Sequence, residues 1–310
     1  MLSTTCVIPY GGPPEYLRET LLSAASQGFA EIILVNDCRP EPDLEAANGI
    51  RQVRILQLDK RSGCAGARNA GVRACHTPFV TFLDADDLLC PDYLSTISAF
   101  VRVRGVRCAA ASLRYIGKRS DRVGAPLSRD PAFILSSGLI CETALVAEAG
   151  YFPLCHAEDV PFFNAVRRII AEISVCHEAK VLYRVHSGSS SSKNGRAMWA
   201  FNRLLPLYYG GQLTLEQAND LSTEFAETGR PPAGLDGPLQ GGVAAAEARY
   251  LARTAYACWL DRDFGRLGKL AFRLARSAPA IASLARHKWS RPLKMAEAAR
   301  NSALTQRTRL

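Results

Sequence analysis

Three carboxylates stand together directly after an apolar segment, in the stretch FLDADD at 82–87. While the chain stays extended, the side chains of Asp84 and Asp86 point to the same side. Grouped carboxylates repel one another, which raises their pKa values unless a cation joins them. Hard oxygen ligands suit Mg²⁺ or Mn²⁺, with phosphate oxygens completing the shell. The stretch therefore indicates a divalent-cation site, and an acidic turn before a helix that starts at Pro91 is the alternative.

Two further side chains follow segments that a nucleotide could approach closely. Asp37 comes after the apolar run EIILV at 31–35, and its carboxylate suits a hydrogen bond from a ribose or a base edge. An aspartate that caps a turn is the alternative. In GCAGARNAG at 63–71, small residues permit close backbone approach, and Arg68 suits a diphosphate. This segment lacks the G-x-G-x-x-G spacing of dinucleotide sites, so alone it is a weak indication.

Two candidates for proton chemistry come later in the chain. Glu158 and Asp159 open a predicted helix, where a carboxylate would serve as a general base. Acidic residues in the first turn of a helix are also favoured by the helix dipole alone. His186 ends the segment YRVH and precedes a serine-rich stretch. A packed or surface histidine is the alternative to a functional one at this position.

The elements that must position these residues alternate between strand and helix patterns. Strands are expected at 4–8, 31–35, 53–58, 78–83 and 179–186, and helices at 15–27, 66–75 and from 91 onwards. This order predicts an α/β fold with a mainly parallel central sheet flanked by helices. Ligands of such sheets bind beyond the carboxyl ends of the strands. Residues 9–12, 36–39 and 84–87 follow three of the predicted strands, so we expect them to gather at one edge.

After the last predicted strand the pattern changes. The composition of Ser187–Gly195 is typical of a flexible loop, and one hypothesis makes it a lid over a bound ligand. Helical patterns follow at 197–209, 214–228, 243–260 and over much of 262–309. We therefore predict two regions, an α/β domain over 1–196 and a helical C-terminal region over 197–310 that is basic from 262.

The positive charge of the chain is concentrated at its C-terminal end. Of the 310 residues 48% are hydrophobic and 22% charged, as in soluble globular proteins, and the formal net charge is +9. Twelve Lys or Arg but two acids lie between Arg262 and Leu310, spread among Ala and Leu. This pattern is typical of an amphipathic helix on anionic lipid, with an ordinary solvated face as an equal alternative. We do not expect a nucleic-acid partner.

The ten cysteines form no C-x-x-C pair, which argues against a zinc ribbon or a redox motif. We expect them to be reduced and to act as small hydrophobic residues, which implies a reducing cytoplasm. No run of about 20 apolar residues suggests a membrane span, and the first ten residues carry no basic signal segment. Together these features predict a cytoplasmic protein.

Taken in order, these segments resemble the family 2 glycosyltransferases, which are inverting enzymes of the GT-A fold. The resemblance extends over residues 3–190 and rests on segments in the family's order. They are VIPYGGPPEYLRETLLSAASQ, EIILVND, ARNAG at 67–71, FLDADD followed by Pro91, Glu158-Asp159, and YRVH at 183–186. Two departures are Tyr10-Gly11-Gly12 after the first strand and Cys38-Arg39 where the family commonly has Gly-Ser.

The resemblance implies a donor site and a catalytic centre. Pro9 and Asp37 would line the nucleoside pocket, with Asp37 bonded to the base, and Arg68 would lie near the nucleotide. Asp84 would contact the ribose or the water shell of the metal.

The same resemblance implies that Asp86 ligates Mn²⁺ or Mg²⁺ and that His186 approaches the metal or the diphosphate. Asp159 would deprotonate the acceptor hydroxyl.

The implied activity is transfer of a sugar from a nucleotide-diphospho-sugar, most often a UDP-sugar, to a glycan or lipid-linked acceptor. The product would belong to a cell-surface polysaccharide or lipopolysaccharide, and the protein could lie on the inner face of the plasma membrane through 262–310. One alternative is a sugar-phosphate nucleotidyltransferase, which would need Lys or Arg directly after the first strand, where none precedes Arg18. Another is a non-catalytic nucleotide-binding protein of the same fold.

Overall fold

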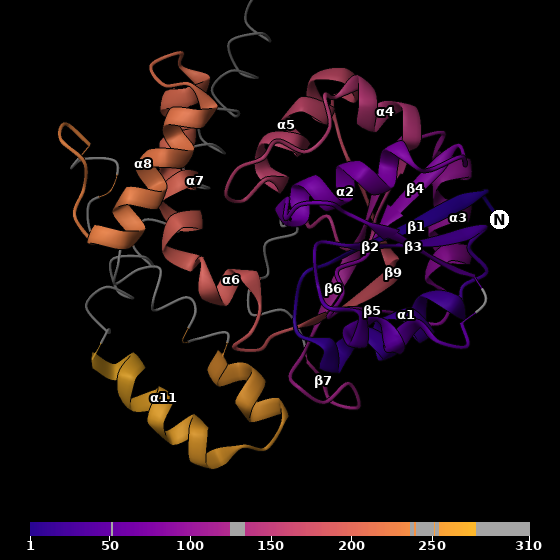
Figure 1. Ribbon diagram of the computed structural model, residues 1–310, viewed down its shortest axis with the longest axis horizontal. Helices are drawn as coiled ribbons and strands as arrows, with labels where there is room; N and C mark the ends of the chain where they lie inside the picture. Colours follow the sequence, from indigo (N-terminus) through magenta and orange to yellow (C-terminus); the bar gives the residue numbers. More distant parts are fainter. Residues whose placement is uncertain (51, 125–133, 236–238, 240–250, 252–253, 277–310) are drawn as a thin grey trace, which may run out of the picture.

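A single mixed sheet forms the centre of the molecule (Figure 1). The computed structural model describes residues 1–50, 52–124, 134–235, 239, 251 and 254–276. Within this part, nine strands take the order β3-β2-β1-β4-β8-β6-β9-β5, and β7 pairs with β6 beside that path. They are β1 (Thr4–Tyr10), β2 (Glu31–Asn36), β3 (Val53–Gln57), β4 (Phe79–Phe82), β5 (Leu88–Leu89), β6 (Cys108–Ile116), β7 (Val123–Gly124), β8 (Leu139–Glu142) and β9 (Ser174–Arg184). All five strands expected from the sequence are present.

The sheet is parallel in its first half and mixed in its second. β1 pairs in parallel with β2 and with β4, and β2 pairs in parallel with β3. β8 is antiparallel to both β4 and β6, β9 is parallel to β6, and β5 is antiparallel to β9. The α/β prediction is confirmed, and its parallel character holds for β1 to β4.

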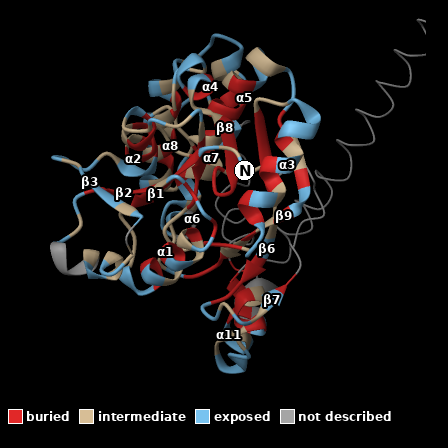
Figure 2. Cartoon of the chain, turned by 90° about the vertical axis from the view of Figure 1, so that its right-hand side faces the viewer, coloured by how far each residue is buried: buried red, intermediate tan, exposed pale blue. Residues whose placement is uncertain are grey.

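Helices cover both faces of the sheet, because the side chains of a strand alternate between the two faces. Cys6, Ile8 and Tyr10 of β1 pack with α1 (Leu17–Ala25) and α3 (Tyr93–Arg104). Val7 faces the opposite way, toward α2 (Gly63–Arg73), α4 (Thr143–Glu148) and α5 (Asp159–Ile170). Figure 2 shows this buried interior between exposed outer helix faces. Two 3₁₀ helices, η1 (Pro14–Tyr16) and η2 (Glu41–Ala47), complete the first half.

The C-terminal region consists of helices that lie against the α/β part. They are α6 (Ser190–Lys193), α7 (Gly195–Tyr209), α8 (Leu215–Thr228), the helical residues 254–260, and α11 (Phe264–Arg276). Thr214 begins α8 with a capping box. The Thr214 hydroxyl accepts from the backbone amide of Gln217, and the Gln217 side chain accepts from the backbone amide of Thr214. Ala157 packs in one apolar cluster with α7 and α8. The division at residue 196 stays a prediction.

Two of the C-terminal expectations need comment. The interpretation of Ser187–Gly195 as a loop throughout is wrong, because Ser190–Lys193 forms a helical turn, with the Lys193 amide bonded to the Ser189 carbonyl at 3.1 Å. Serine competes for turn hydrogen bonds but also suits the start of a helix, so its composition does not distinguish the two. The helical pattern at 243–260 is confirmed for 254–260, and 277–310 lies outside the described residues. No described helix has both the length and the apolar character that a bilayer crossing requires.

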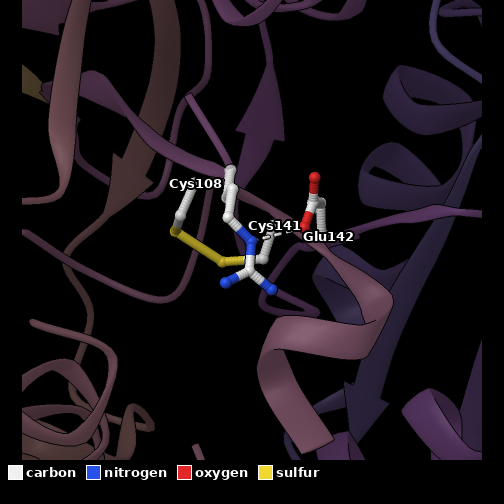
Figure 3. Close-up of a disulfide and its surroundings, with 4 residues drawn as sticks. Cys108, Cys141 and Glu142 are labelled. Carbon is white, nitrogen blue, oxygen red and sulfur yellow. Dashed lines mark hydrogen bonds and ion pairs between the residues drawn. A yellow bond between two sulfur atoms is a disulfide. The ribbon is translucent and has the colours of Figure 1, made fainter. Parts of the chain in front are cut away.

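One pair of cysteines contradicts the expectation that all ten are thiols. Cys108 of β6 and Cys141 of β8 form a disulfide, next to the ion pair of Arg107 with Glu142 (Figure 3). The two residues are direct cross-strand partners, with Cα atoms 4.2 Å apart, as in the close pairs of an antiparallel ladder. The sequence does not reveal this register, because the strands are separated by a long connection.

Candidate active site

The carboxyl ends of β1, β2 and β4 meet at one edge of the sheet and carry three of the predicted residues there. Pro9 lies in β1 opposite Val35, and the Asp37 amide donates to the Tyr10 carbonyl at 2.8 Å. Asp84 follows β4 by two residues. The expected clustering at the carboxyl edge is therefore present, because parallel neighbours end at the same side.

Asp37 is buried and tied to the start of α2. Its two carboxylate oxygens accept from the backbone amides of Ser62 at 2.6 Å and Gly63 at 3.0 Å. The side chain therefore joins the end of β2 to the segment that leads to Arg68. The next residue, Cys38, has a φ of 60°, in the left-handed region where glycine is favoured. This geometry explains physically why a glycine suits the position.

Arg68 is the centre of the site. Its guanidinium is buried and donates through Nη2 to Asp84 Oδ1 and through Nη1 to Glu158 Oε1, both at 2.6 Å. Its Nη1 also lies 3.8 Å from Asp159 Oδ1. The ring of Phe152 lies under it, 5.4 Å from the guanidinium carbon. Arg68 thus joins the end of β4 to the start of α5, two segments far apart in the sequence.

Asp159 occupies the first position of α5 and is held by a serine that the sequence analysis did not single out. Its Oδ1 accepts from the Ser136 hydroxyl at 2.7 Å, and its Oδ2 accepts from the Ser136 amide at 3.3 Å. Burial, reinforced by the neighbouring Glu158 carboxylate, raises the pKa of Asp159 to about 6, although Arg68 acts in the opposite direction. A carboxylate of this kind is ionised at neutral pH yet more basic than an ordinary one.

Asp84 has a similar environment. Burial raises the pKa of Asp84 above its ordinary value, while the Arg68 guanidinium beside it lowers that pKa in part. Its backbone amide donates to the Ser137 hydroxyl at 3.3 Å. Ser136 and Ser137 precede β8, and no pattern in the sequence distinguishes them from other serines.

Asp86 and His186 form a direct pair, which the sequence analysis did not predict. Asp86 Oδ2 lies 2.8 Å from His186 Nε2, and the other ring nitrogen, Nδ1, accepts from the Gly188 amide at 3.1 Å. This second bond places the ring proton of neutral His186 on Nε2, facing the carboxylate. Tyr16 packs against the imidazole with ring centroids 4.8 Å apart. About three quarters of the Asp86 side chain is buried, since 25% of it is exposed.

The buried residues Arg184 and Asp87 lie beside this pair, and the sequence analysis gave neither of them a role of its own. The fully buried Arg184 side chain donates to the Asp86 carbonyl at 2.8 Å, to the Lys118 carbonyl at 2.7 Å and to Glu19 Oε2 at 2.6 Å. Its backbone amide donates to Asp87 Oδ1 at 2.8 Å. Burial, with the charge of Asp86 nearby, raises the pKa of Asp87 well above its ordinary value. These bonds hold the acidic loop against the end of β9.

The arrangement is that of a GT-A fold, the architecture of many nucleotide-sugar-dependent transferases. Comparison with solved structures supports this directly. The structure of Staphylococcus aureus TarS residues 1–349 in complex with UDP-GlcNAc superposes with a TM-score of 0.57 at 20% sequence identity, and the match covers 84% of each chain.

Sequence comparisons agree with the fold. A Haemophilus influenzae protein named as an uncharacterized glycosyltransferase is 26% identical over 212 residues, which are 63% of this chain and 85% of that protein. The poly(ribitol-phosphate) beta-N-acetylglucosaminyltransferase TarS of S. aureus is 27% identical over 204 residues, 59% of this chain and 35% of TarS. Residues 5–145 match glycosyl transferase family 2. This matched segment contains Arg68, Asp84 and Asp86.

Proposed function

We propose that the chain transfers a sugar from a UDP-sugar to an acceptor hydroxyl with inversion at the anomeric carbon and with the help of a divalent cation. The observation that carries the proposal is the bridge made by Arg68, which brings Asp159 of α5 beside the acidic loop after β4. A base and a leaving-group site are thereby close together. The match of residues 5–145 to glycosyl transferase family 2 supports the reaction class, and the named UDP-GlcNAc complex of TarS supports the donor class.

In this proposal Asp159 is the general base. Its raised pKa, about 6, leaves it ionised near pH 7 and able to take the acceptor's hydroxyl proton as the carbon–oxygen bond forms. The Ser136 hydroxyl and amide hold both carboxylate oxygens in place. General-base catalysis of this kind contributes about 10²–10⁴-fold. The acceptor oxygen attacks from the face opposite the nucleoside diphosphate, which inverts the anomeric centre.

On the donor side, Pro9 and Asp37 line the nucleoside pocket, and Arg68 and Asp84 lie toward the ribose and diphosphate. Asp37 already accepts two amides, so a base would compete with or add to these bonds at its remaining lone pairs. The left-handed Cys38 and the following Arg39 form the rim of this pocket, and they are the residues by which base selection would differ from relatives with Gly-Ser.

The residues present suit a divalent cation. Asp86 offers a partly exposed carboxylate whose second oxygen has no bond to His186, and Asp84 lies two residues before it. Within the described residues there is no group of three or more His, Cys, Asp or Glu arranged to enclose a metal ion, so diphosphate oxygens would complete the shell. Mn²⁺ or Mg²⁺ held by Asp86, with His186 beside it, would supply charge neutralisation for the departing diphosphate.

For the acceptor we propose a hydroxyl of a cell-surface glycan or of a lipid-linked precursor. The name of one relative supports this acceptor class, since TarS is a poly(ribitol-phosphate) beta-N-acetylglucosaminyltransferase. Helices α7 and α8 pack on Ala157, two residues before Asp159. These helices therefore belong to the acceptor side in this proposal.

Calorimetric titration with UDP, GDP, CDP and dTDP, each with Mn²⁺ and with EDTA, tests the donor site. We expect metal-dependent binding of UDP that is lost in Asp86→Ala and kept in Asp159→Asn. Asp220→Ala on the exposed face of α8 removes an equal charge and serves as the control. Failure of all four nucleotides to bind would favour the non-catalytic alternative. Release of pyrophosphate from a nucleoside triphosphate and a sugar 1-phosphate would favour the nucleotidyltransferase.

A further inference from the structure

One end of the molecule combines the β6–β7 hairpin with the turn between the helical residues 254–260 and α11. The amides of Lys118 and Arg119 donate to the two carboxylate oxygens of Asp261, at 2.8 and 3.2 Å. The ring of Tyr256 packs edge-on against Tyr115, with centroids 6.5 Å apart. Figures 1 and 2 both show β7 and α11 toward the lower end of the molecule. Segments more than a hundred residues apart thus build one surface.

Large apolar side chains project from this end into solvent. Trp259 is 55% exposed, Phe264 64% and Val123 44%. Trp259 is held in place by stacking on Tyr256, with centroids 5.7 Å apart. Exposed aromatic residues with a fixed orientation are costly in water unless a partner covers them.

The charges of the same end are unbalanced toward the positive. Its acids are engaged locally: Asp261 accepts the two hairpin amides, Asp263 accepts the Arg266 amide at 3.0 Å, and Asp121 pairs with Arg119 at 2.9 Å. None of the following forms an ion pair with another residue that the structure describes: Lys118, Arg122, Arg262 and Lys269.

We infer that this basic-aromatic end, formed by Lys118, Arg119, Arg122, Val123, Trp259, Arg262, Phe264 and Lys269, docks on a bilayer that contains anionic phospholipid. Aromatic and aliphatic side chains enter the headgroup region while the surrounding cations meet lipid phosphates. A second copy of the chain fits poorly, because a symmetric contact would bring the unpaired cations together. Nucleic acid would satisfy the cations but would leave Val123 without an apolar partner.

The docking end is connected to the candidate active site through one buried side chain. Arg184 donates to the carbonyls of Lys118 in the hairpin and of Asp86 in the acidic loop. A bilayer bound at the hairpin would therefore lie near the edge of the sheet that carries the site. The inference rests on the surface alone and holds whether or not the proposed transfer reaction is correct.

Co-sedimentation of the full chain with vesicles tests this inference. Vesicles of phosphatidylcholine with phosphatidylglycerol are compared with vesicles of phosphatidylcholine alone, at low and high salt. We expect binding to the anionic vesicles only, and weaker binding at high salt. Each cation near such a surface contributes about fivefold in affinity, so Lys118→Glu with Lys269→Glu should weaken binding by at least about tenfold. Phe264→Ser should also weaken it.

Matched variants elsewhere on the surface separate this docking end from general attraction. Arg167→Glu with Arg168→Glu on α5 changes the charge by the same amount, and Val103→Ser removes another exposed apolar side chain, 84% exposed. Both should bind anionic vesicles like the wild type. Equal losses in the two charge variants, or unchanged binding of the Lys118/Lys269 variant, would overturn the inference. So would wild-type binding to an RNA oligonucleotide in preference to the anionic vesicles. UDP titration of each variant reports separately on the proposed donor site.

Discussion

Arg68 is shared among carboxylates that would otherwise repel one another. Its replacement should therefore lower the free energy of unfolding more than replacement of an exposed arginine does. Removing one partner from a buried ion pair costs about 3–5 kcal/mol, because the remaining charge stays buried. We expect Arg68→Met to lower the free energy of unfolding by about 3 kcal/mol. The matched variant Arg54→Met breaks an exposed pair with Glu31 and should cost about 1 kcal/mol or less. Urea titrations of both at pH 7 and pH 5 measure this.

The penalty in Arg68→Met should shrink at pH 5, because the carboxylates of Asp84 and Asp159, whose pKa values are raised by burial, can then take up protons. A loss equal to that of Arg54→Met at pH 7 would contradict the central role given to Arg68.

Asp159 should show its raised pKa in both stability and rate. Its folded pKa, about 6, lies above the ordinary aspartate value of 3.8, so the folded state binds the proton more tightly than the unfolded state does. Its contribution to stability is therefore greatest below pH 4 and is lost as the pH rises toward 6. As the pH rises from 4 to 6, the free energy of unfolding of Asp159→Asn should therefore increase relative to that of the wild type. The expected change in this difference is about 1–2 kcal/mol after allowance for solvent screening. Urea titrations across the range measure the difference.

The rate should follow the same group in the opposite sense. If Asp159 is the base, the wild-type transfer rate falls about tenfold per pH unit below pH 6, and Asp159→Asn binds donor but loses at least about 10²-fold in transfer. Near-full transfer by that variant would reject the assignment. Ser136→Ala should lower the rate less than Asp159→Asn does, since it removes one of two bonds to the carboxylate.

Among single residues, charged side chains that follow a predicted strand could be singled out from the sequence, but their hydrogen-bond partners could not. The resemblance implied separate roles for Arg68, Asp84, Asp86 and His186 at one site, but it did not predict that Asp84 pairs with Arg68 or Asp86 with His186. Ser136 and Arg184 act through hydrogen bonds whose geometry depends on the whole fold, so their residue types carried no signal. Asp37 shows an intermediate case, since both alternatives for it are met: it lies at the expected edge and also ties the turn before α2.

At the scale of elements, α2 must lie very close to the sheet to deliver Arg68. A Cβ atom on Gly71 would collide with the Val7 side chain of β1 and crowd Val35 of β2. We expect Gly71→Ala to destabilise the protein by about 2 kcal/mol or more through overpacking. Gly268 in α11 has open space around its Cα, so Gly268→Ala should stabilise by about 0.5–1 kcal/mol through helix propensity. Thermal unfolding of both variants measures the contrast.

Rescue gives this prediction its control. Val7→Ala combined with Gly71→Ala frees the space that the new methyl group needs, so the double variant should be more stable than the sum of the single losses implies. Strictly additive losses would show that α2 does not depend on this close approach.

The elements also show where sequence patterns stop being informative. The strands β1, β2, β3, β4 and β9 were predictable from apolar runs, and so was the parallel half of the sheet, since strands alternated with helices. The nine-residue strand β6 was not predicted. β5 and β7 have two residues each, too few for a period to appear, and β8 was not predicted although it is as long as β4. Their pairing is set by tertiary contacts, and with it the register that brings Cys108 opposite Cys141. The helical turn at Ser190–Lys193 was missed because serine is common in loops.

At the scale of the whole molecule, the helical region contacts the α/β part in two separate places. His156, before α5, bonds to Thr223 of α8 at 3.0 Å, and Ala157 packs in the cluster that contains Phe225. At the other end, Val185 and Tyr115 cluster with Ala257. Because the helical region and the α/β part share buried contacts in both places, unfolding of either part removes these contacts from the other. We therefore expect residues on both sides of position 196 to unfold in one cooperative transition, even if the boundary predicted there is a true domain boundary.

Differential scanning calorimetry of the full chain with two matched core variants tests this expectation. Phe225→Ala lies in α8 and Ile97→Ala in α3, and both side chains are buried. Such truncations cost about 2–5 kcal/mol, which lowers the Tm of a protein of this size by about 5–15 °C. In a cooperative molecule each variant shifts one and the same transition, with equal calorimetric and van't Hoff enthalpies. Two transitions, of which Phe225→Ala moves one and Ile97→Ala the other, would instead mean that the helices fold independently of the sheet.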